Sequence, residues 1–133
     1  MNDVISIKLP SKPEYVSIAR LAASVLGNNV GFDIEEIEDI KVAVGEACNN
    51  AILHGTSDAN YFELCFDVKD DRLDIEVKDN GTGFDKNTYN EPDLENPKES
   101  GLGIFIIKSL MDEVDIAGKN GEGTKLLMTK YLE

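Results

Sequence analysis

Apolar and polar residues alternate along five short stretches of this chain, as they do in strands that bury one face. The stretches are residues 5–9, 62–68, 73–77, 113–117 and 125–131. Only a polar Lys-Asp-Asp-Arg segment, of hairpin-turn length, separates the second stretch from the third. The pattern therefore predicts five strands, with one hairpin in the middle of the chain and a second pair at its end.

Apolar residues at spacings of three and four predict three helices. The first helix is expected to begin at a capping box made by Ser11 and Glu14. It should end near Leu26, because a glycine, Gly27, follows. The third helix is expected to begin at Gly101 and to be largely apolar.

The second helix is the longest. Asp33 and Glu36 form another capping-box pair at its start, and Gly55 follows its expected end. Its apolar stripe consists of Ile37, Ile40, Val44, Ala47 and Ala51. Hairpins and helices without a repeating β-α-β rhythm favour a two-layer α/β sandwich with a mixed, mostly antiparallel sheet. A chain of 133 residues is expected to form one domain, residues 1–133.

The formal net charge is −13, and no basic stripe is present. This charge argues against binding to nucleic acid or to an anionic membrane surface. No apolar stretch reaches the roughly 20 residues of a membrane span, and the N-terminus lacks a signal-peptide pattern. Both cysteines, Cys48 and Cys65, lie in segments with apolar periodicity and are expected to be buried free thiols. We expect a cytoplasmic protein.

A polar group occurs on the longest helix. Glu46 and Asn50 are one turn apart, so they project from the same face, close to Asn49 and to His54 near the helix end. An amide oxygen such as that of Asn50 suits Mg²⁺, which prefers oxygen ligands and bridges phosphates. Glu46 could accept a proton from an attacking hydroxyl group. An exposed polar helix face would explain the same residues.

A second polar group follows the third strand. Asp79 stands at the strand end, and Gly81 and Gly83 come next. A carboxylate there can accept a hydrogen bond from the adenine amino group, and glycines let the backbone approach the ring. An Asp-Asn-Gly hairpin turn is the alternative, but residues 85–100 form an irregular polar stretch instead of a partner strand.

A third group opens the last helix. Ser100, Gly101, Leu102 and Gly103 place small residues where free N–H groups and the helix dipole favour phosphate. Flexible glycines before a helix would explain the same pattern. Near the start of the last strand, Thr124 adds a hydroxyl group after two turn glycines.

In this order, the elements resemble the ATP-binding boxes of the GHKL superfamily, which has the Bergerat fold. Residues 46–54 are similar to its N box, 79–84 to its G1 box, 100–104 to its G2 box and 121–124 to its last box. The run over residues 101–114 is especially similar to bacterial anti-sigma factor serine/threonine kinases. The resemblance extends from residue 34 to the end of the chain.

The resemblance implies a homodimeric kinase that binds ATP and Mg²⁺. Such a protein sequesters a sigma factor of RNA polymerase and phosphorylates an anti-anti-sigma protein. It implies that Glu46 is the general base and Asn50 the Mg²⁺ ligand. Residues 85–100 would form a lid over the nucleotide. The remaining residues would bind nucleotide, with Asp79 reading adenine, and they are Asn49, His54, Asp79, Gly81, Gly83, Ser100, Gly101, Leu102, Gly103 and Thr124.

One departure from the family is that many relatives carry an arginine beside the G2 glycines, whereas the nearest basic residue here is Lys98. Two further function classes stay open. One is a nucleotide-gated binding regulator without phosphotransfer, and the other is a kinase acting on a partner other than a sigma factor. The presence of Glu46 favours an enzyme. A two-component histidine kinase is disfavoured, because the only histidine, His54, lies within the nucleotide box.

The first helix is apolar over more than one stripe, which is more than a single buried face needs. Arg20, one of only two arginines in the chain, lies within it. These features predict a partner or dimer surface in the N-terminal half. A buried helix with one arginine reaching solvent is the alternative.

Overall fold

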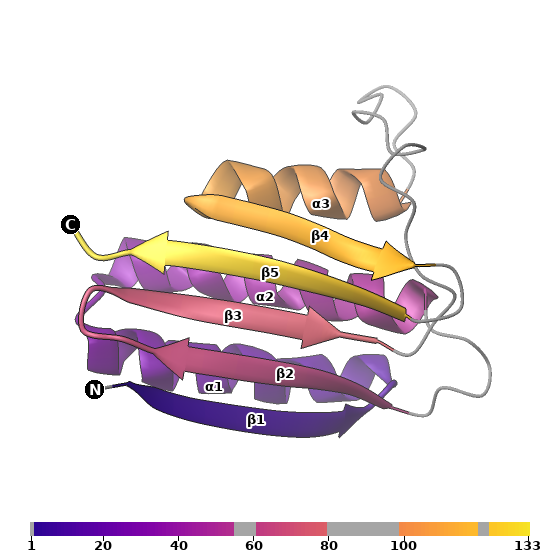
Figure 1. Cartoon of the computed structure of the whole chain (residues 1–133), viewed down its shortest axis with the longest axis horizontal. Coiled ribbons are helices and arrows are strands. Elements are labelled where there is room, and N and C mark those ends of the chain that lie inside the picture. Colours follow the sequence, from indigo (N-terminus) through magenta and orange to yellow (C-terminus); the bar gives the residue numbers. More distant parts are fainter. Residues whose placement is uncertain (1, 55–60, 80–98, 120–122) are drawn as a thin grey trace.

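The computed structural model describes residues 2–54, 61–79, 99–119 and 123–133. Within these residues, a five-stranded sheet carries three helices on one of its faces, and the other face is open (Figure 1). The predicted two-layer α/β sandwich is confirmed. The strands are β1 (Asp3–Pro10), β2 (Tyr61–Val68), β3 (Arg72–Lys78), β4 (Glu113–Lys119) and β5 (Gly123–Tyr131).

The strand order is β1-β2-β3-β5-β4, and all four pairings between the described strands are antiparallel. The sheet is therefore more uniform than the mixed one expected. Both predicted pairs are present, namely the β2–β3 hairpin and the β4–β5 pair. In the hairpin turn, the Lys69 N–H donates to the Arg72 carbonyl over 3.0 Å.

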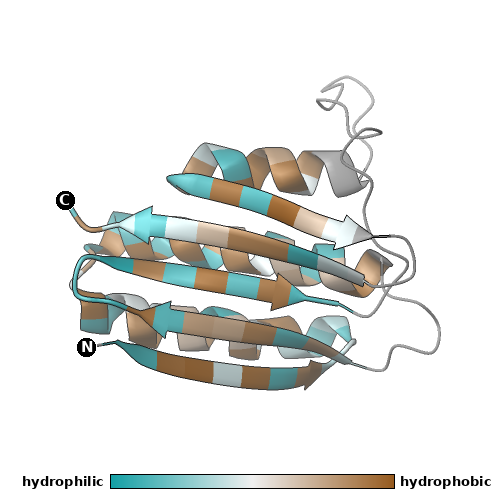
Figure 2. Cartoon of the chain, viewed as in Figure 1, coloured by the Kyte–Doolittle hydropathy of each residue, from teal (hydrophilic) through white to brown (hydrophobic). Residues whose placement is uncertain are grey.

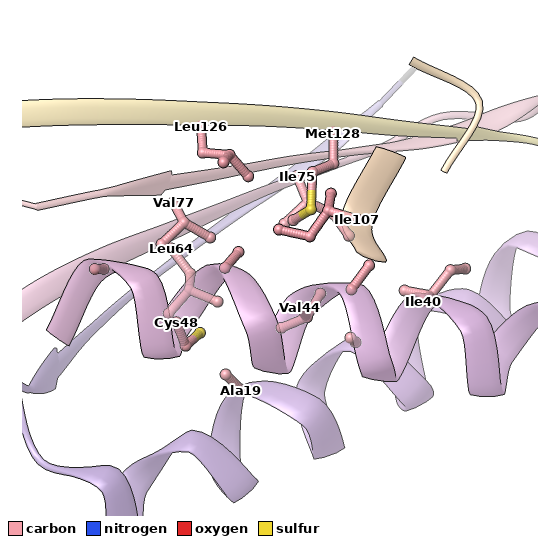
Figure 3. Close-up of a cluster of buried hydrophobic side chains, with 14 of the residues drawn as sticks. Ala19, Ile40, Val44, Cys48, Leu64, Ile75, Val77, Ile107, Leu126 and Met128 are labelled. Carbon is pink, nitrogen blue, oxygen red and sulfur yellow. The ribbon is translucent and has the colours of Figure 1, made fainter. Parts of the chain in front are cut away.

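The helices are α1 (Val16–Val30), α2 (Ile34–His54) and α3 (Glu99–Leu110), and α2 lies between the other two (Figure 1). Apolar residues alternate with polar ones along the strands (Figure 2). The apolar set meets the stripe of α2, where Ile40, Val44 and Cys48 face Leu64 and Ile75 of the sheet (Figure 3). No helix among the described residues is long and apolar enough to span a membrane.

The capping box at the start of α2 is confirmed. The Glu36 N–H donates to Asp33 Oδ1 over 2.8 Å, and the Asp33 N–H donates to Glu36 Oε1 over 3.1 Å. Each side chain thus satisfies a backbone donor that the first helical turn leaves without a partner. This reciprocal pair fixes where the longest helix begins.

The capping box predicted at Ser11 and Glu14 is wrong. Pro13 begins a short 3₁₀ turn, Pro13–Tyr15, and α1 begins only at Val16 without a side-chain cap. Lys12 precedes the proline and is extended, because the proline ring disfavours a helical conformation in the residue before it. The proline therefore moves the helix start beyond the expected box.

The predicted end of α1 is also wrong, because the helix continues through Gly27 to Val30. Gly27 is buried against α2, and a Cβ atom there would lie 3.5 Å from Ile37 Cγ1, so this glycine belongs to the packing of the two helices. The residue that ends the helix is Gly31, whose φ of 113° suits a left-handed cap. The start of α3 differs as well, since Glu99 precedes the expected Gly101. An acidic residue there suits the positive end of the helix dipole.

The two free cysteines lie on opposite sides of the sheet. Cys48 on α2 is fully buried, as predicted. Cys65 is only half-buried, because it stands between the inward-facing Leu64 and Phe66 and so points to the open face. Burial raises the pKa of the Cys48 thiol to about 12, although the nearby Arg20 guanidinium opposes the rise.

We predict that a chromogenic disulfide reagent at pH 8 modifies Cys65 quickly and Cys48 only on unfolding. With a pKa of about 12, the thiolate fraction of Cys48 at this pH is about one part in 10⁴. One thiol per chain should therefore react in the native protein and two in denaturant. The Cys65→Ser variant should show no fast phase, and a fast phase in this variant would contradict the burial of Cys48.

Candidate nucleotide site

A cleft of about 430 Å³ lies between α2 and the first turns of α3. Glu46, Asn49 and Asn50 line it from α2, and Leu102 and Gly103 line it from α3. Two predicted groups, far apart in sequence, therefore meet in one cleft. The rest of its lining is mainly apolar and comes from Pro13, Ile52, Leu53 and Ile106.

Glu46 lies against α3. A Cβ atom built on Gly103 would lie only 3.2 Å from Glu46 Oε2, closer than ordinary van der Waals contact. The glycine is buried, so the carboxylate fills the space that a larger side chain would take. A larger residue at position 103 would require the Glu46 carboxylate to move by a few tenths of an ångström. The structure suggests that Gly103 leaves room for the Glu46 carboxylate. This role is separate from the predicted contact of Gly103 with phosphate.

Asn50 is the most informative side chain of the cleft. It is only 9% exposed, and its Oδ1 atom has no hydrogen-bond partner among the described residues. An unsatisfied buried acceptor costs about 1–3 kcal/mol, so native proteins seldom keep one without a use. An oxygen held in this way inside a cleft is a suitable Mg²⁺ ligand. In the described parts of the chain, no group of three or more His, Cys, Asp or Glu side chains could hold a metal ion.

Asp79 and Thr124 are joined at the end of the sheet. The Asp79 N–H donates to the Thr124 carbonyl over 3.0 Å, and the Thr124 N–H donates to Asp79 Oδ1 over 3.2 Å. Both residues are almost fully buried, at 3% and 4% exposure. The reciprocal bonds extend the β3–β5 ladder by one pair and fix the direction of the carboxylate.

The end of β3, the start of β5, the C-terminus of α2 and the N-terminus of α3 all lie at one end of the molecule (Figure 1). Asp79 and Thr124 therefore share this end with the cleft. The first turn of α3 includes Ser100 and Gly101, and its unpaired N–H groups give the positive end of the helix dipole. This end of the molecule combines a buried amide oxygen and a buried carboxylate with the N–H groups of a helix start.

Several predicted residues fall outside what the structure describes. Gly81, Gly83 and the lid residues 85–98 lie in the undescribed segment 80–98. His54 is the last residue of α2 and Ser100 lies in α3, but their side chains are not described. Sequence reasoning missed Pro13 and Ile106, of which Pro13 reaches the cleft from the 3₁₀ turn before α1 and Ile106 lies one turn beyond Gly103 on α3.

The contact between Glu46 and Gly103 predicts a specific effect of Gly103→Ala. The new methyl group would displace the Glu46 carboxylate, and phosphotransfer should fall by roughly 10- to 100-fold, as small misplacements of reacting groups do. ATP binding, measured by calorimetry, should change much less. Gly27→Ala is the matched control, because its Cβ atom would meet only ordinary contacts starting at 3.5 Å. Equal kinase rates in both variants would contradict the role of Gly103.

Comparison with known proteins agrees with this geometry. The family model of the histidine kinase-like ATPase domain matches residues 9–130. The serine-protein kinase RsbW of Bacillus cereus is 40% identical, over 97% of this chain and 85% of its own. The serine-protein kinase RsbW of Listeria monocytogenes is 39% identical, over 99% of this chain and 89% of its own.

Solved structures share the fold. The RsbU and RsbW domains of Rv1364c from Mycobacterium tuberculosis match with a TM-score of 0.73 and 20% identity, over 98% of this chain and 32% of that chain. The histidine kinase domain of a blue-light activated kinase from Erythrobacter litoralis matches with a TM-score of 0.57 and 22% identity, over 92% of this chain and 61% of that chain. The GHKL-type fold and the protein serine kinase class expected from the sequence are confirmed, and this chain belongs to the family of histidine kinase-like ATPase domains.

Proposed function

We propose that this chain is an ATP-dependent serine/threonine kinase and anti-sigma factor. It transfers the γ-phosphate of ATP to a serine or threonine hydroxyl group of an anti-anti-sigma protein, and it sequesters a sigma factor of RNA polymerase. The observation that carries the nucleotide part is the buried Asn50 oxygen, which lacks a partner in the described residues and shares a cleft with Glu46. The similarity to serine-protein kinases supports the reaction.

Asp79 sets the position of adenine in this proposal. Its carboxylate, held by the Thr124 N–H, accepts the amino hydrogen of adenine. Guanine has an oxygen at that position, which would face a second acceptor in a buried place. Thr124 supports this end of the pocket from the side of β5. ATP is thereby favoured over GTP.

The phosphates lie toward the N-terminus of α3, where backbone N–H groups of the Gly101 and Gly103 turn donate to them. Asn50 Oδ1 is the oxygen offered to Mg²⁺, and its position in the cleft suits that ion. Mg²⁺, when bound, neutralises phosphate charge and orients the γ-phosphate for attack. Since the chain carries a net charge of −13, local donors are needed to hold a polyanion.

Glu46 accepts the proton of the attacking serine or threonine hydroxyl group. The oxygen of that hydroxyl forms a bond to the γ-phosphorus while the bond to the bridging oxygen of ADP breaks, and the proton moves to the carboxylate. The place of Glu46 against Gly103 keeps its carboxylate in the cleft near the donors of α3. This position supports its proposed role as the base.

The partner surface is proposed on the outer side of the helical layer. Ile18, Leu21 and Val25 of α1 are 44%, 66% and 54% exposed. They lie at helical spacing, on the side of α1 away from its buried residues. A contiguous exposed apolar stripe of this kind marks interaction sites. Arg20 lies across Gly45 of α2, with its Nη1 3.1 Å from where a Cβ atom would stand. We also propose a homodimer and a cytoplasmic location.

The roles of Glu46 and Asn50 predict different defects one helical turn apart. Glu46→Gln keeps the size of the side chain but removes the proton acceptor, so phosphotransfer should fall roughly 10²–10⁴-fold while ATP affinity persists. Asn50→Ala should lose Mg²⁺-dependent ATP affinity as well as activity. Calorimetry and transfer of label from γ-labelled ATP to the products of neighbouring genes measure both. Phosphotransfer at the parental rate by Glu46→Gln would favour a nucleotide-gated binding regulator.

The place of Arg20 over Gly45 predicts that partner binding can be lost without loss of nucleotide binding. Arg20→Ala removes the guanidinium group, and Gly45→Ala should displace it from its position over α2. Both variants should therefore weaken binding of the sigma factor or of the phosphorylated protein about 10-fold or more. Lys41→Ala is the matched control, since it removes a charge of the same sign from the same helical layer. Unchanged partner affinity in both arginine-site variants would exclude this surface.

A further inference from the structure

α3 carries apolar side chains on more sides than its packing uses. No polar side chain occurs from Gly101 to Ile107, although 29% of the residues of the chain are charged. Seven consecutive residues cover the whole circumference of a helix, and a helix that is apolar all round is usually buried. α3 packs against α2 and the sheet, but no described helix or strand lies on its outer flank (Figure 1). Part of its apolar surface is therefore left for a partner.

The unused surface of α3 is a stripe of three side chains. Ile104 and Ile107 are almost fully buried, so the side of α3 that carries them serves the core. Leu102, Phe105 and Ile106 follow one another at spacings of three and four and share another side of the helix. Phe105 is 36% exposed, and the other two are half-buried beside the nucleotide cleft. This stripe borders the cleft on the side of α3.

Val42 of α2 continues the stripe across the helix pair. It lies one turn before Glu46 on the same side of α2 and is 46% exposed. α2 ends and α3 begins at the same end of the molecule, so the two helices are antiparallel (Figure 1). Since Glu46 contacts Gly103, Val42 and Ile106 each lie one turn beyond this contact. We call Val42, Leu102, Phe105 and Ile106 the apolar flank of the cleft.

The apolar flank lies on the side of the base from which the acceptor must approach. Asn50 is one turn nearer than Glu46 to the end of the sheet where Asp79 and Thr124 are joined. In phosphoryl transfer the attacking and leaving oxygens lie roughly in line, on opposite sides of the phosphorus. With adenine at Asp79, ADP departs toward that end, and the acceptor hydroxyl group comes from the other direction, past Val42.

We infer that the apolar flank binds an apolar side chain of the phosphorylated protein, close to its acceptor serine or threonine. This inference rests on the proposed function and names a feature that the substrate must carry. One helical turn separates Val42 from Glu46, which is about 5.4 Å along the axis. An extended segment covers this distance in about two residues and a helix in about four. The apolar side chain therefore lies within about four residues of the acceptor.

The apolar flank also adjoins the surface proposed for partner binding. Gly45, over which Arg20 lies, follows Val42 by three residues on the same side of α2. A protein bound at Arg20 can thus reach the flank and the base without leaving the outer side of the helical layer. None of the four side chains of the flank is charged, so a charge brought there by the substrate would be buried without a partner.

A charge on the flank should impair binding of the acceptor protein and spare the chemistry. Phe105→Glu should raise the KM for the protein that gains label from γ-labelled ATP roughly 10- to 100-fold, because docking would bury an unpaired carboxylate. The kcat at saturating acceptor and the affinity for ATP, measured by calorimetry, should stay within about 3-fold, since Phe105 does not line the cleft.

Two further variants control this experiment. Val42→Gln should also raise the KM, and a neutral residue is used there because a charge would lie one turn from Glu46. Ile34→Glu is the matched control and should leave the KM unchanged. It places the same charge on an exposed apolar position of the helical layer, at the opposite end of α2. Thermal unfolding checks that each variant folds.

A charge swap tests the contact directly. Mass spectrometry locates the labelled residue of the acceptor protein, and each apolar residue within four positions of it is changed to lysine in turn. One of these acceptor variants should be a poor substrate of the parental kinase. The Phe105→Glu kinase should phosphorylate the same variant at least about 10-fold better, because the two new charges attract each other. A kinase that is merely damaged cannot gain activity in this way.

The results distinguish failure of this inference from failure of the proposed function. If no protein gains label from ATP, the kinase function is wrong, and the inference is wrong with it. If a protein gains label with the same KM for Phe105→Glu, Val42→Gln and Ile34→Glu, the kinase stands and the flank is not its acceptor site. If Phe105→Glu changes the sedimentation of the kinase alone, the flank contacts a second copy, which also overturns the inference.

Discussion

The burial of α2 on three sides is the constraint on which the rest of this structure depends. The helix packs on the sheet beneath it and has α1 and α3 on its two flanks (Figure 1). Alanine recurs along it, and Ala43, Ala47 and Ala51 are buried with no more than 3% exposure. Small side chains let neighbouring helices approach closely, and large apolar ones such as Ile40 and Val44 fill the space above the strands. Little freedom remains in how the helix can turn about its axis.

This fixed rotation of α2 determines where its polar side chains point. Asn50 is buried and Glu46 is directed at α3, because the stripe from Ile40 to Ala51 holds the adjacent side of the helix on the sheet. The stability of the core therefore supports one side chain that is unfavourable by itself. Binding sites are often built in this way, with local strain or unsatisfied groups balanced by packing elsewhere.

The sequence was sufficient where local rules act alone. The periodic stretches became the observed strands and helices, and the pair Asp33 and Glu36 caps α2 as expected. Local rules failed where two signals compete. Pro13 overrode the apparent cap at Ser11, and the packing of Gly27 against α2 overrode its usual meaning as a helix end. From the sequence alone, a glycine that ends a helix cannot be distinguished from one that lets two helices pack closely.

In the nucleotide site, too, local sequence predicted some features and the packing of helices decided the others. Five of the predicted residues line the cleft, namely Glu46, Asn49, Asn50, Leu102 and Gly103. The sequence could not show that Glu46 rests on Gly103 or that the Asn50 oxygen lacks a partner in the described residues. Both facts depend on how α2 and α3 pack. The apolar part of the cleft, including Pro13 and Ile106, was missed for the same reason.

The position of β5 has a consequence for how the protein is made. β5 is the last strand of the chain, but it lies inside the sheet between β3 and β4. The bonds that fix Asp79 come from Thr124 on this strand, so the end proposed to bind adenine cannot form until β5 has been synthesised and has paired with β3. A nascent or truncated chain would leave the inner edge of β3 open and aggregation-prone. A chain that stops before β5 would therefore lack the two hydrogen bonds that hold the Asp79 backbone and carboxylate in place.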